Sequence, residues 1–357
     1  MKTYIKFLVQ VFLKSFLNIF LILLSLVFIL NILTEIEFFK NTNVNSFYPL
    51  YLSLMNSPSV IFEMFPFIFL ISTQFFFIKL FNNNEIQIFK YSGLKNTKIL
   101  GVLSFLTFFM GLLIITFFYN LSSNLQGFYL ELKNQYSKDD KYLAVITKNG
   151  LWIKDVVNDE ISIINSSKIN KNFLEDTFIT TFDENHELIK SIKSDNIDIK
   201  NRKWLIYDAT VFQNNNSQKV DLIEFQSNFD LKRVKSLFSN LSSLSILKLL
   251  DLRENYKSLN YSIIEVDVQI HKIISYPIYL SLMTILSAII MFNTRNFSST
   301  TLKISIGLFL SVIIYYINNF FNVMGITEKI PLIIAVWLPL LIFCLINLIM
   351  LLKINEK

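Results

Sequence analysis

The sequence predicts a membrane α-helical bundle of six transmembrane helices, split three and three around an inserted all-β domain. The 357-residue chain is 53% hydrophobic and contains 36 Phe, which is more apolar side chain than a soluble domain of this size buries. Several apolar runs are long enough to cross a bilayer. The stretch between the third and fourth of these runs alternates in short polar and apolar segments, as strands do.

A helix needs roughly 20 largely apolar residues to cross the hydrocarbon core, and each predicted span is long enough. The first run is too long for the core of a signal peptide and no small-residue cleavage site follows it, so we expect it to remain as a span. The predicted spans are residues 7–33, 58–80, 99–119, 271–293, 303–322 and 330–352.

The distribution of Lys and Arg predicts the orientation. With both termini inside, ten basic residues lie in the termini and short loops on the cytoplasmic side, against two, Lys40 and Lys329, in the short outer loops. Residues 121–265 then lie outside the cytoplasm. The formal charge of +6 follows this orientation and forms no basic stripe, so we expect no nucleic-acid partner.

The sequence offers no pattern typical of an enzyme. One cysteine, Cys344, cannot form an intrachain disulfide, and the two histidines, His186 and His271, are far apart in the chain. No nucleotide-binding loop, nucleophile elbow or paired-carboxylate pocket is evident. We therefore predict no catalytic residue, no cofactor and no metal site, and we expect any ATP hydrolysis to take place in a separate chain.

The middle segment predicts about eight short strands in a sandwich or jelly roll, with Asn149-Gly150 as a strong hairpin turn. We expect three regions: residues 1–120 with the first three spans, 121–265 with the β domain and helical connectors, and 266–357 with the last three spans. The expected strands are Tyr142–Thr147, Leu151–Lys154, Glu160–Ile164, Phe173–Phe182, Leu188–Ile192, Ile197–Ile199, Lys203–Phe212 and Val220–Phe225.

The loop at residues 81–98 contains a predicted short helix at about 84–92, with Asn84 as its cap and Gly93 at its end. Apolar Ile86, Ile88 and Phe89 are too many for a solvated loop. One interpretation is a helix lying on lipid headgroups. The interpretation that we favour is a helix docked in a groove of a cytoplasmic partner, with Glu85 facing a basic residue there.

Six short motifs, in order along the whole chain, make it resemble the LptF/LptG (YjgP/YjgQ) permeases of the lipopolysaccharide transport ABC exporter, LptG more closely than LptF. Tyr91 stands where the family's loop motif has alanine. The motifs are Phe65-Pro66, the loop from Asn84-Glu85 to Ser92-Gly93, the segment from Gly150 to Asp155 (Gly-Leu-Trp-Ile-Lys-Asp), Lys203-Trp204-Leu205, His271-Lys272-Ile273 with Pro277, and the ending from Gly325-Ile326 through Pro331 to Leu338-Pro339.

The resemblance implies a bacterial inner-membrane permease that extracts lipopolysaccharide and passes it to a periplasmic bridge. It implies three protein partners: a cytoplasmic ABC ATPase dimer, a second six-helix permease that is LptF-like, and a single-span jelly-roll protein that is LptC-like. It also implies two groups of site residues. The ATPase-coupling group is Glu85, Ile86, Phe89, Ser92 and Gly93. The group at the lipid cavity or gate is Asn31, Lys40, Tyr315, Tyr316 and Asn319.

Some alternatives stay open at this point. Only Lys40 matches the lysines that the family often carries at the outer end of the first span, so the cargo headgroup is less phosphorylated or the partner supplies the charge. A homodimer could replace the heterodimer. A non-transporting scaffold and a permease for another envelope lipid or lipoprotein are rival functions, although lipoprotein-releasing permeases typically use four spans.

Overall fold

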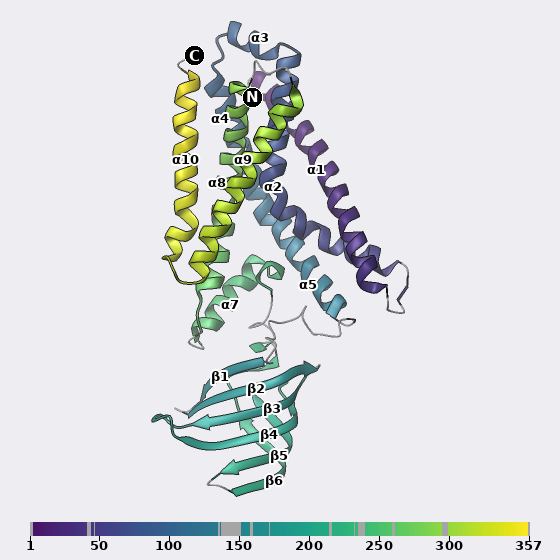
Figure 1. Ribbon diagram of the computed structural model, residues 1–357, viewed down its shortest axis with the longest axis vertical. Helices are drawn as coiled ribbons and strands as arrows, with labels where there is room; N and C mark the ends of the chain where they lie inside the picture. The colour runs from purple at the N-terminus through teal and green to yellow at the C-terminus, as the bar shows by residue number, and fades with distance from the viewer. Residues whose placement is uncertain are drawn as a thin grey trace. The chain divides into compact units, whose positions relative to one another are not determined.

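The computed structural model describes the chain except residues 1–2, 41–43, 46, 135, 137–150, 158–159, 171, 214–215, 232, 235–239, 259–260, 295–298 and 356–357. The expected strand Tyr142–Thr147 and the turn at Asn149-Gly150 lie outside the described residues. The chain forms two compact units, one from Met1–Tyr129 with Ile264–Lys357 and one from Leu130–Ile263 (Figure 1). The first unit is helical, and the second contains the sheet.

Among the described residues, the helical unit contains six helices that are long and apolar enough to cross a membrane, which confirms the predicted number of spans. The helices extend beyond the predicted apolar runs, and the third continues through a π-helical turn, Ile114–Tyr119, into α5. The spanning elements are α1 (Thr3–Phe39), α2 (Tyr48–Asn82), α4 (Asn96–Leu113) with α5 (Asn120–Asn134), α8 (Ile264–Asn293), α9 (Thr300–Ile326) and α10 (Leu332–Asn355). Both chain ends lie at the same end of this unit as the short helix α3 (Glu85–Tyr91) (Figure 1).

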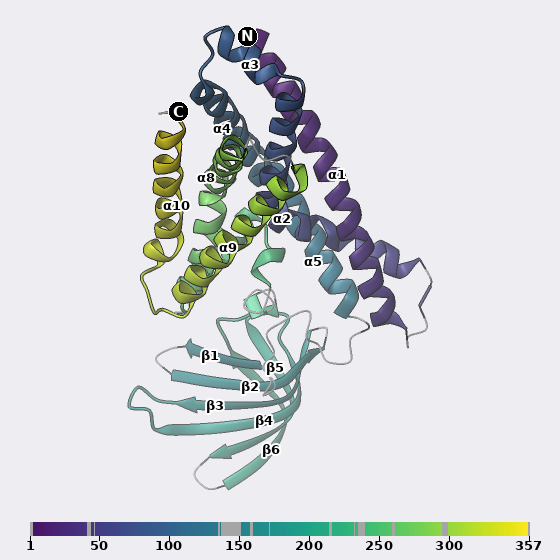
Figure 2. The same ribbon diagram turned by 45° about the horizontal axis from the view of Figure 1, so that its top comes forward.

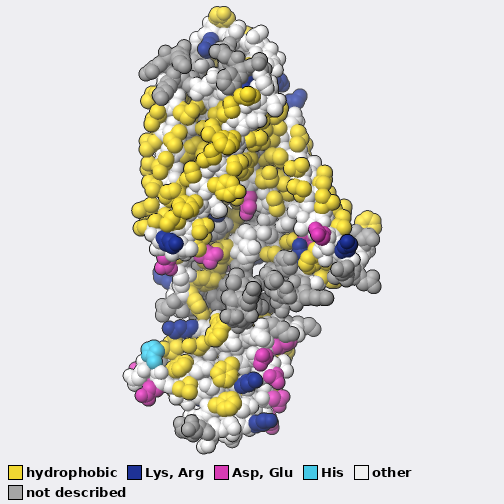
Figure 3. Space-filling view, in the orientation of Figure 1, with side chains coloured by type: hydrophobic (Ala, Val, Ile, Leu, Met, Phe, Trp, Pro, Cys, Tyr) yellow, Lys and Arg dark blue, Asp and Glu magenta, His cyan; other side chains and the backbone are white. Residues whose placement is uncertain are grey.

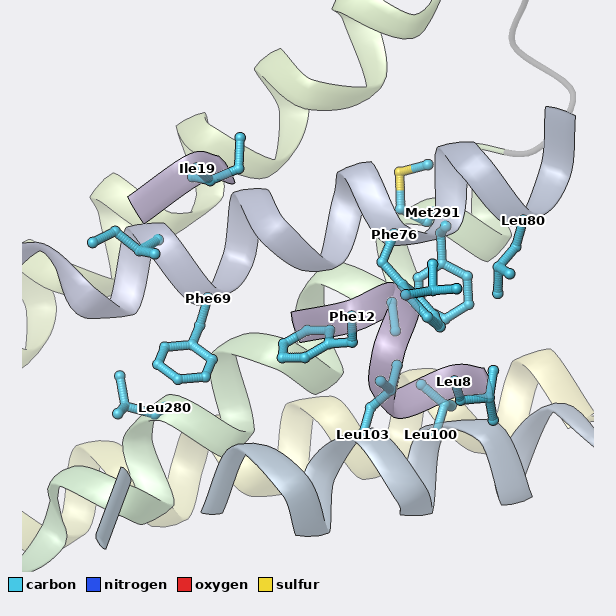
Figure 4. Packing of buried hydrophobic residues seen from close by; sticks show 14 of the residues in the cluster. Leu8, Phe12, Ile19, Phe69, Phe76, Leu80, Leu100, Leu103, Leu280 and Met291 are labelled. Atoms are coloured by element: carbon cyan, nitrogen blue, oxygen red, sulfur yellow. The ribbon is translucent and has the colours of Figure 1, made fainter. Parts of the chain in front are cut away.

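Helix α8 is the most buried of the six spans and packs against α2, α4, α9 and α10. Small residues allow the close approach of α4: a Cβ at Gly111 would stand 2.8 Å from Pro277 Cα. Apolar side chains from α1, α2, α4 and α8 share one core, in which Phe12 lies between Phe69 and Leu103 (Figure 4). Close packing of small and apolar residues is what holds helices together when lipid is the solvent.

Helices α1 and α9 are the least buried spans. α1 packs on α2 and α4, and α9 packs on α2, α8 and α10. Their remaining faces carry exposed large apolar residues, and such residues cover the face of the helical unit seen in Figure 3. In a membrane protein these faces meet lipid, cargo or another chain.

The second unit is built on an antiparallel six-stranded sheet in which each strand pairs with its neighbour in sequence. An all-β insert is therefore confirmed, but the described strands follow a simple meander without the crossed connections of a jelly roll. One expectation about the strands was wrong: Leu188–Ile192 and the start of Ile197–Ile199 belong to one strand, which ends before Ile199. The strands are β1 (Leu151–Val157), β2 (Glu160–Asn170), β3 (Phe173–Phe182), β4 (Leu188–Asp198), β5 (Lys203–Gln213) and β6 (Asn216–Gln226).

The sheet curves strongly (Figure 2), and a line of irregular positions crosses its strands. Asp176 in β3 and Asp208 in β5 both have positive φ, 47° and 48°. On either side of such a position the buried side chains are three residues apart instead of two, as with Ile206 and Ala209 in β5. The pairing register does not shift at Asp176 or Asp208, and the apolar face stays on the same side of the sheet beyond both of them.

One face of the sheet is covered by the chain that follows β6. Asp155 of β1 is buried and accepts hydrogen bonds from the Ser227 hydroxyl at 2.7 Å and from the Asn228 side-chain amide at 3.0 Å. The buried Trp204 indole donates to the Phe229 carbonyl at 2.7 Å. The Asp155 bonds hold the segment after β6 against the opposite edge strand, and the Trp204 bond holds it against the strand next to β6. The remaining described elements of this unit are a 3-10 turn, Leu241–Ser243, and helix α7 (Ile246–Ser258).

Candidate functional site

Helix α3 is a short helix fixed to the helical unit at its α2–α4 connection. Ile86 is 1% exposed and belongs to the same apolar core as Leu8 and Phe12 of α1. The ring of Phe89 meets that of Phe7 edge to face, with ring centroids 6.0 Å apart. A displacement of α3 is therefore passed directly to α1 and to the core that α2 and α4 share with it.

This geometry changes the interpretation of two predicted coupling residues. Ile86 and Phe89 face the bundle, so they cannot fill a groove on a partner without leaving the core. The outward face of α3 instead carries Ile88, 58% exposed, and Tyr91, 89% exposed. Their spacing of three residues places them on one side of a helix. A seven-residue helix is too short for its apolar spacing alone to identify that side.

Glu85 opens α3 and is half buried. Its Oε1 accepts a hydrogen bond from the Asn83 side chain at 3.1 Å. Its Oε2 is buried and has no hydrogen-bond partner in the part of the chain that the structure describes. An unsatisfied buried carboxylate oxygen is costly, so a turn of the half-buried side chain that brings Oε2 to the surface would let it accept a donor from another chain.

The end of α3 is fixed by the other two predicted coupling residues. The Ser92 hydroxyl donates to the Ile88 carbonyl at 2.9 Å. Gly93 has φ of 76°, the left-handed conformation that glycine adopts without strain, and its N–H donates to the Lys90 carbonyl at 3.0 Å. These two residues end the helix, and both are exposed next to Tyr91.

The five predicted cavity residues do not gather at one point of this chain. Asn31 donates to the Ser57 hydroxyl at 3.1 Å and so joins α1 to α2. Lys40 is exposed just beyond the end of α1. Tyr315 packs its ring on Phe67 of α2, with centroids 5.7 Å apart, and it borders the exposed Tyr316. Asn319, one turn further along α9, is also exposed.

The structure adds a charged group that the sequence analysis did not assign. Glu63 of α2 interacts electrostatically with Lys272 and Tyr276 of α8 and with Tyr315 of α9, and we call these four residues the Glu63 cluster. The ring of Tyr276 stacks on Phe62 at 4.8 Å and its hydroxyl donates to the Phe62 carbonyl, which fixes α8 against α2 at this level. Glu63 is the single acidic residue of its predicted span, residues 58–80, and its neighbours in the cluster come from two later spans.

Two further polar contacts join the helices. Glu35, expected in a loop, lies inside α1 and is buried, and the Tyr129 hydroxyl of α5 donates to its Oε1 at 2.8 Å. His271 Nδ1 of α8 accepts a hydrogen bond from the Trp337 indole of α10 at 3.2 Å. Both contacts tie the helix ends opposite α3.

Six apolar spans with an all-β insert between the third and fourth define a multi-pass membrane protein. The family model for the lipopolysaccharide export system permease LptF/LptG matches residues 6–353, nearly the whole chain. The chain therefore belongs to the LptF/LptG family, a family of transport permeases. No curated protein matches it.

Proposed function

We propose that this chain is a permease subunit of an ABC exporter, and that it extracts lipopolysaccharide from the outer leaflet of the inner membrane and passes it to a periplasmic bridge. The observation that carries the proposal is the family match over residues 6–353. The proposed partners are a cytoplasmic ABC ATPase dimer, a second six-helix permease and a single-span periplasmic jelly-roll protein. Residues from Gly325 to Pro339 favour the LptG-like subunit.

The proposed orientation places α3 and both termini in the cytoplasm and the sheet in the periplasm. Lys79, Lys90, Lys95, Lys98 and Lys303 belong to the α3 end of the helical unit, as the preference of Lys and Arg for the cytoplasmic side requires. α3 is then open to a cytoplasmic motor. The β unit, at the other side of the membrane, is free to receive the cargo.

The physical task is to move several acyl chains, each of which costs about 0.8 kcal/mol per methylene when exposed to water. The exposed apolar faces of α1 and α9 supply part of an apolar wall, and a second permease supplies the rest. When the wall is compressed, the lipid leaves toward the β unit. Helices α1 and α9 are suited to move because they are the least buried spans.

Helix α3 is the proposed lever. Tyr91 and Ile88 contact the ATPase, and the half-buried Glu85 carboxylate turns outward to accept a hydrogen bond from a basic side chain of that partner. Ile86 and Phe89 anchor the lever to the helices that form the wall. Closure of the ATPase dimer therefore moves α1 and α2 through packed side chains.

The test is the pair Tyr91→Ala and Glu85→Lys, made in the full chain and purified from its own cell membrane. Both variants should insert normally but retain less ATPase and lose transport of lipopolysaccharide, since one removes an outward contact and the other reverses a charge. Gln87→Ala, an exposed position on the same helix, is the matched control. Wild-type transport by Glu85→Lys, or purification of the wild type without any ATPase, would refute the assignment.

A further inference from the structure

The Glu63 cluster places an acid and a base on helix faces that no described part of the chain covers. Glu63 and Lys272 are both exposed. Their separation exceeds the 4.0 Å of an ion pair, and neither side-chain head group hydrogen-bonds to another described residue. Ionisable side chains inside spans are rare and usually mark a functional pathway. Both head groups are therefore available to a ligand.

The depth of the cluster is that of a lipid headgroup. At a rise of about 1.5 Å per residue, Glu63 lies about 28 Å along α2 from its end beside α3, and Lys272 about 32 Å along α8 from Asn293. The hydrocarbon core is about 30 Å thick. The two charges thus stand where the hydrocarbon meets the headgroups of the leaflet remote from α3.

The chemistry of the cluster distinguishes between headgroups. A site for a purely anionic headgroup would contain only cationic side chains, because a carboxylate repels a phosphate. Here Lys272 offers an ammonium group to a phosphate and Glu63 offers a carboxylate to an amine. The hydroxyl of Tyr315, which is half exposed beside them, adds a neutral hydrogen-bonding group. Two opposite charges on adjacent helices match a headgroup that carries a phosphate next to a primary amine.

We infer that the Glu63 cluster binds a zwitterionic lipid headgroup, with Glu63 on the primary amine and Lys272 on the phosphate. This inference rests on the proposed function, because the headgroup belongs to a lipid that enters from that leaflet. It deepens that function by naming an amine on the cargo: a phosphoethanolamine-bearing lipid A has this chemistry, and so does phosphatidylethanolamine. It also agrees with the few lysines at the outer end of α1.

The test measures which lipids stay bound to the full chain. The protein is exchanged into mixed micelles with equal amounts of phosphatidylethanolamine, phosphatidylcholine and phosphatidylglycerol, and retained lipids are counted by native mass spectrometry. The wild type should prefer the ethanolamine lipid to the choline lipid, whose amine cannot donate a hydrogen bond, and to the glycerol lipid, which has no amine. Glu63→Gln should lower that preference about tenfold, the effect of losing one charge-assisted hydrogen bond.

Glu37→Gln, an exposed acid of α1, is the matched control and should keep the preference. Lys272→Gln should weaken retention of all three phospholipids without reordering them. Equal retention of the three lipids by the wild type, or an unchanged preference in Glu63→Gln, would overturn the inference. A wild type that favours phosphatidylglycerol would overturn it as well.

A second arm separates the two sources of the headgroup by offering lipid A with and without phosphoethanolamine. Preference for the modified lipid A identifies the cargo as the ligand. Preference for phosphatidylethanolamine with no discrimination between the lipid A forms identifies a bulk phospholipid, which still supports the headgroup chemistry. Neither measurement requires an ATPase, so the failure of this inference and the failure of the proposed coupling through α3 are seen in different experiments.

Discussion

Gly307 of α9 lies so close to the Gln74 side chain of α2 that a Cβ at position 307 would stand 2.1 Å from Gln74 Nε2. The same nitrogen donates to the Lys303 carbonyl at 2.9 Å, one turn earlier in α9. Gln74 is fully buried. Gly307 and the Gln74 side chain therefore determine how closely α9 approaches α2. α9 is one of the two least buried spans.

Gly307→Ala should destabilise the helical unit by about 1–3 kcal/mol, because the methyl group displaces the Gln74 amide and breaks its part-buried hydrogen bond to the Lys303 carbonyl. The thermal midpoint of the full chain in detergent measures this. Gly101→Ala is the control, since nothing lies within 4 Å of a Cβ there, and it should be neutral or stabilising. In a double-mutant cycle, Gln74→Ala should relieve much of the effect of Gly307→Ala; strict additivity would contradict the contact.

Trp204 should be the more important tryptophan of the two family motifs in the sheet. Its indole is fully buried and bonded to the Phe229 carbonyl, whereas Trp152 is 56% exposed. Trp204→Phe should cost about 1–3 kcal/mol by leaving that carbonyl unsatisfied, and Trp204→Ala about 3–5 kcal/mol. Hydrogen exchange of the strand amides reports the loss. A larger effect from Trp152→Phe than from Trp204→Phe would contradict this assignment.

Tyr261 should make the stability of the β unit depend on pH in the alkaline range. Its hydroxyl accepts from the Lys154 N–H at 3.0 Å, and burial raises the pKa of the phenol above its usual value. Folding thus favours the protonated form. This stabilisation is complete below about pH 10 and is lost as the pH rises through the folded-state pKa.

The measurement for Tyr261 is the urea midpoint of the β unit, followed by tryptophan fluorescence between about pH 8 and pH 11. The wild-type midpoint should fall at the alkaline end, and Tyr261→Phe should reduce that fall while lowering the midpoint throughout. Tyr207→Phe, an exposed tyrosine of β5, is the control. A fall of equal size in wild type and Tyr261→Phe would assign the alkaline loss to other groups.

The spans could be predicted from the sequence because a membrane requires about 20 apolar residues in one run, whatever the helices later contact. The direction of α3 could not, since Ile86 and Phe89 form one apolar side of this short helix and Ile88 and Tyr91 form another. Which of them is buried depends on Phe7 and Leu8, and those residues come from a different span.

The other differences between the prediction and the structure arise from contacts between residues that are far apart in the sequence. Glu63 comes near Lys272 only through the packing of α2 on α8, and no local pattern in the sequence predicts that proximity. The sequence predicts two strands in place of β4, and polar Ser194, Asp195 and Asn196 lie between them. In the fold Ser194 Oγ bonds to the Tyr207 carbonyl of the next strand at 2.6 Å, so the strand continues through its polar centre.

Substitutions at Asp208 test whether the positive-φ positions, Asp176 and Asp208, shape the sheet. A β-branched residue is strained at its φ of 48°, so Asp208→Val should destabilise the β unit by about 1–3 kcal/mol, although valine normally favours strands. Asp208→Gly should be tolerated, since glycine adopts this conformation freely. The matched control is Asp221→Val, because Asp221 lies opposite Asp208 on β6, is exposed and has an ordinary backbone. Asp221→Val removes the same charge without the backbone strain of a positive φ. If urea unfolding finds the two valine variants equally stable, the positive φ contributes nothing to the bend.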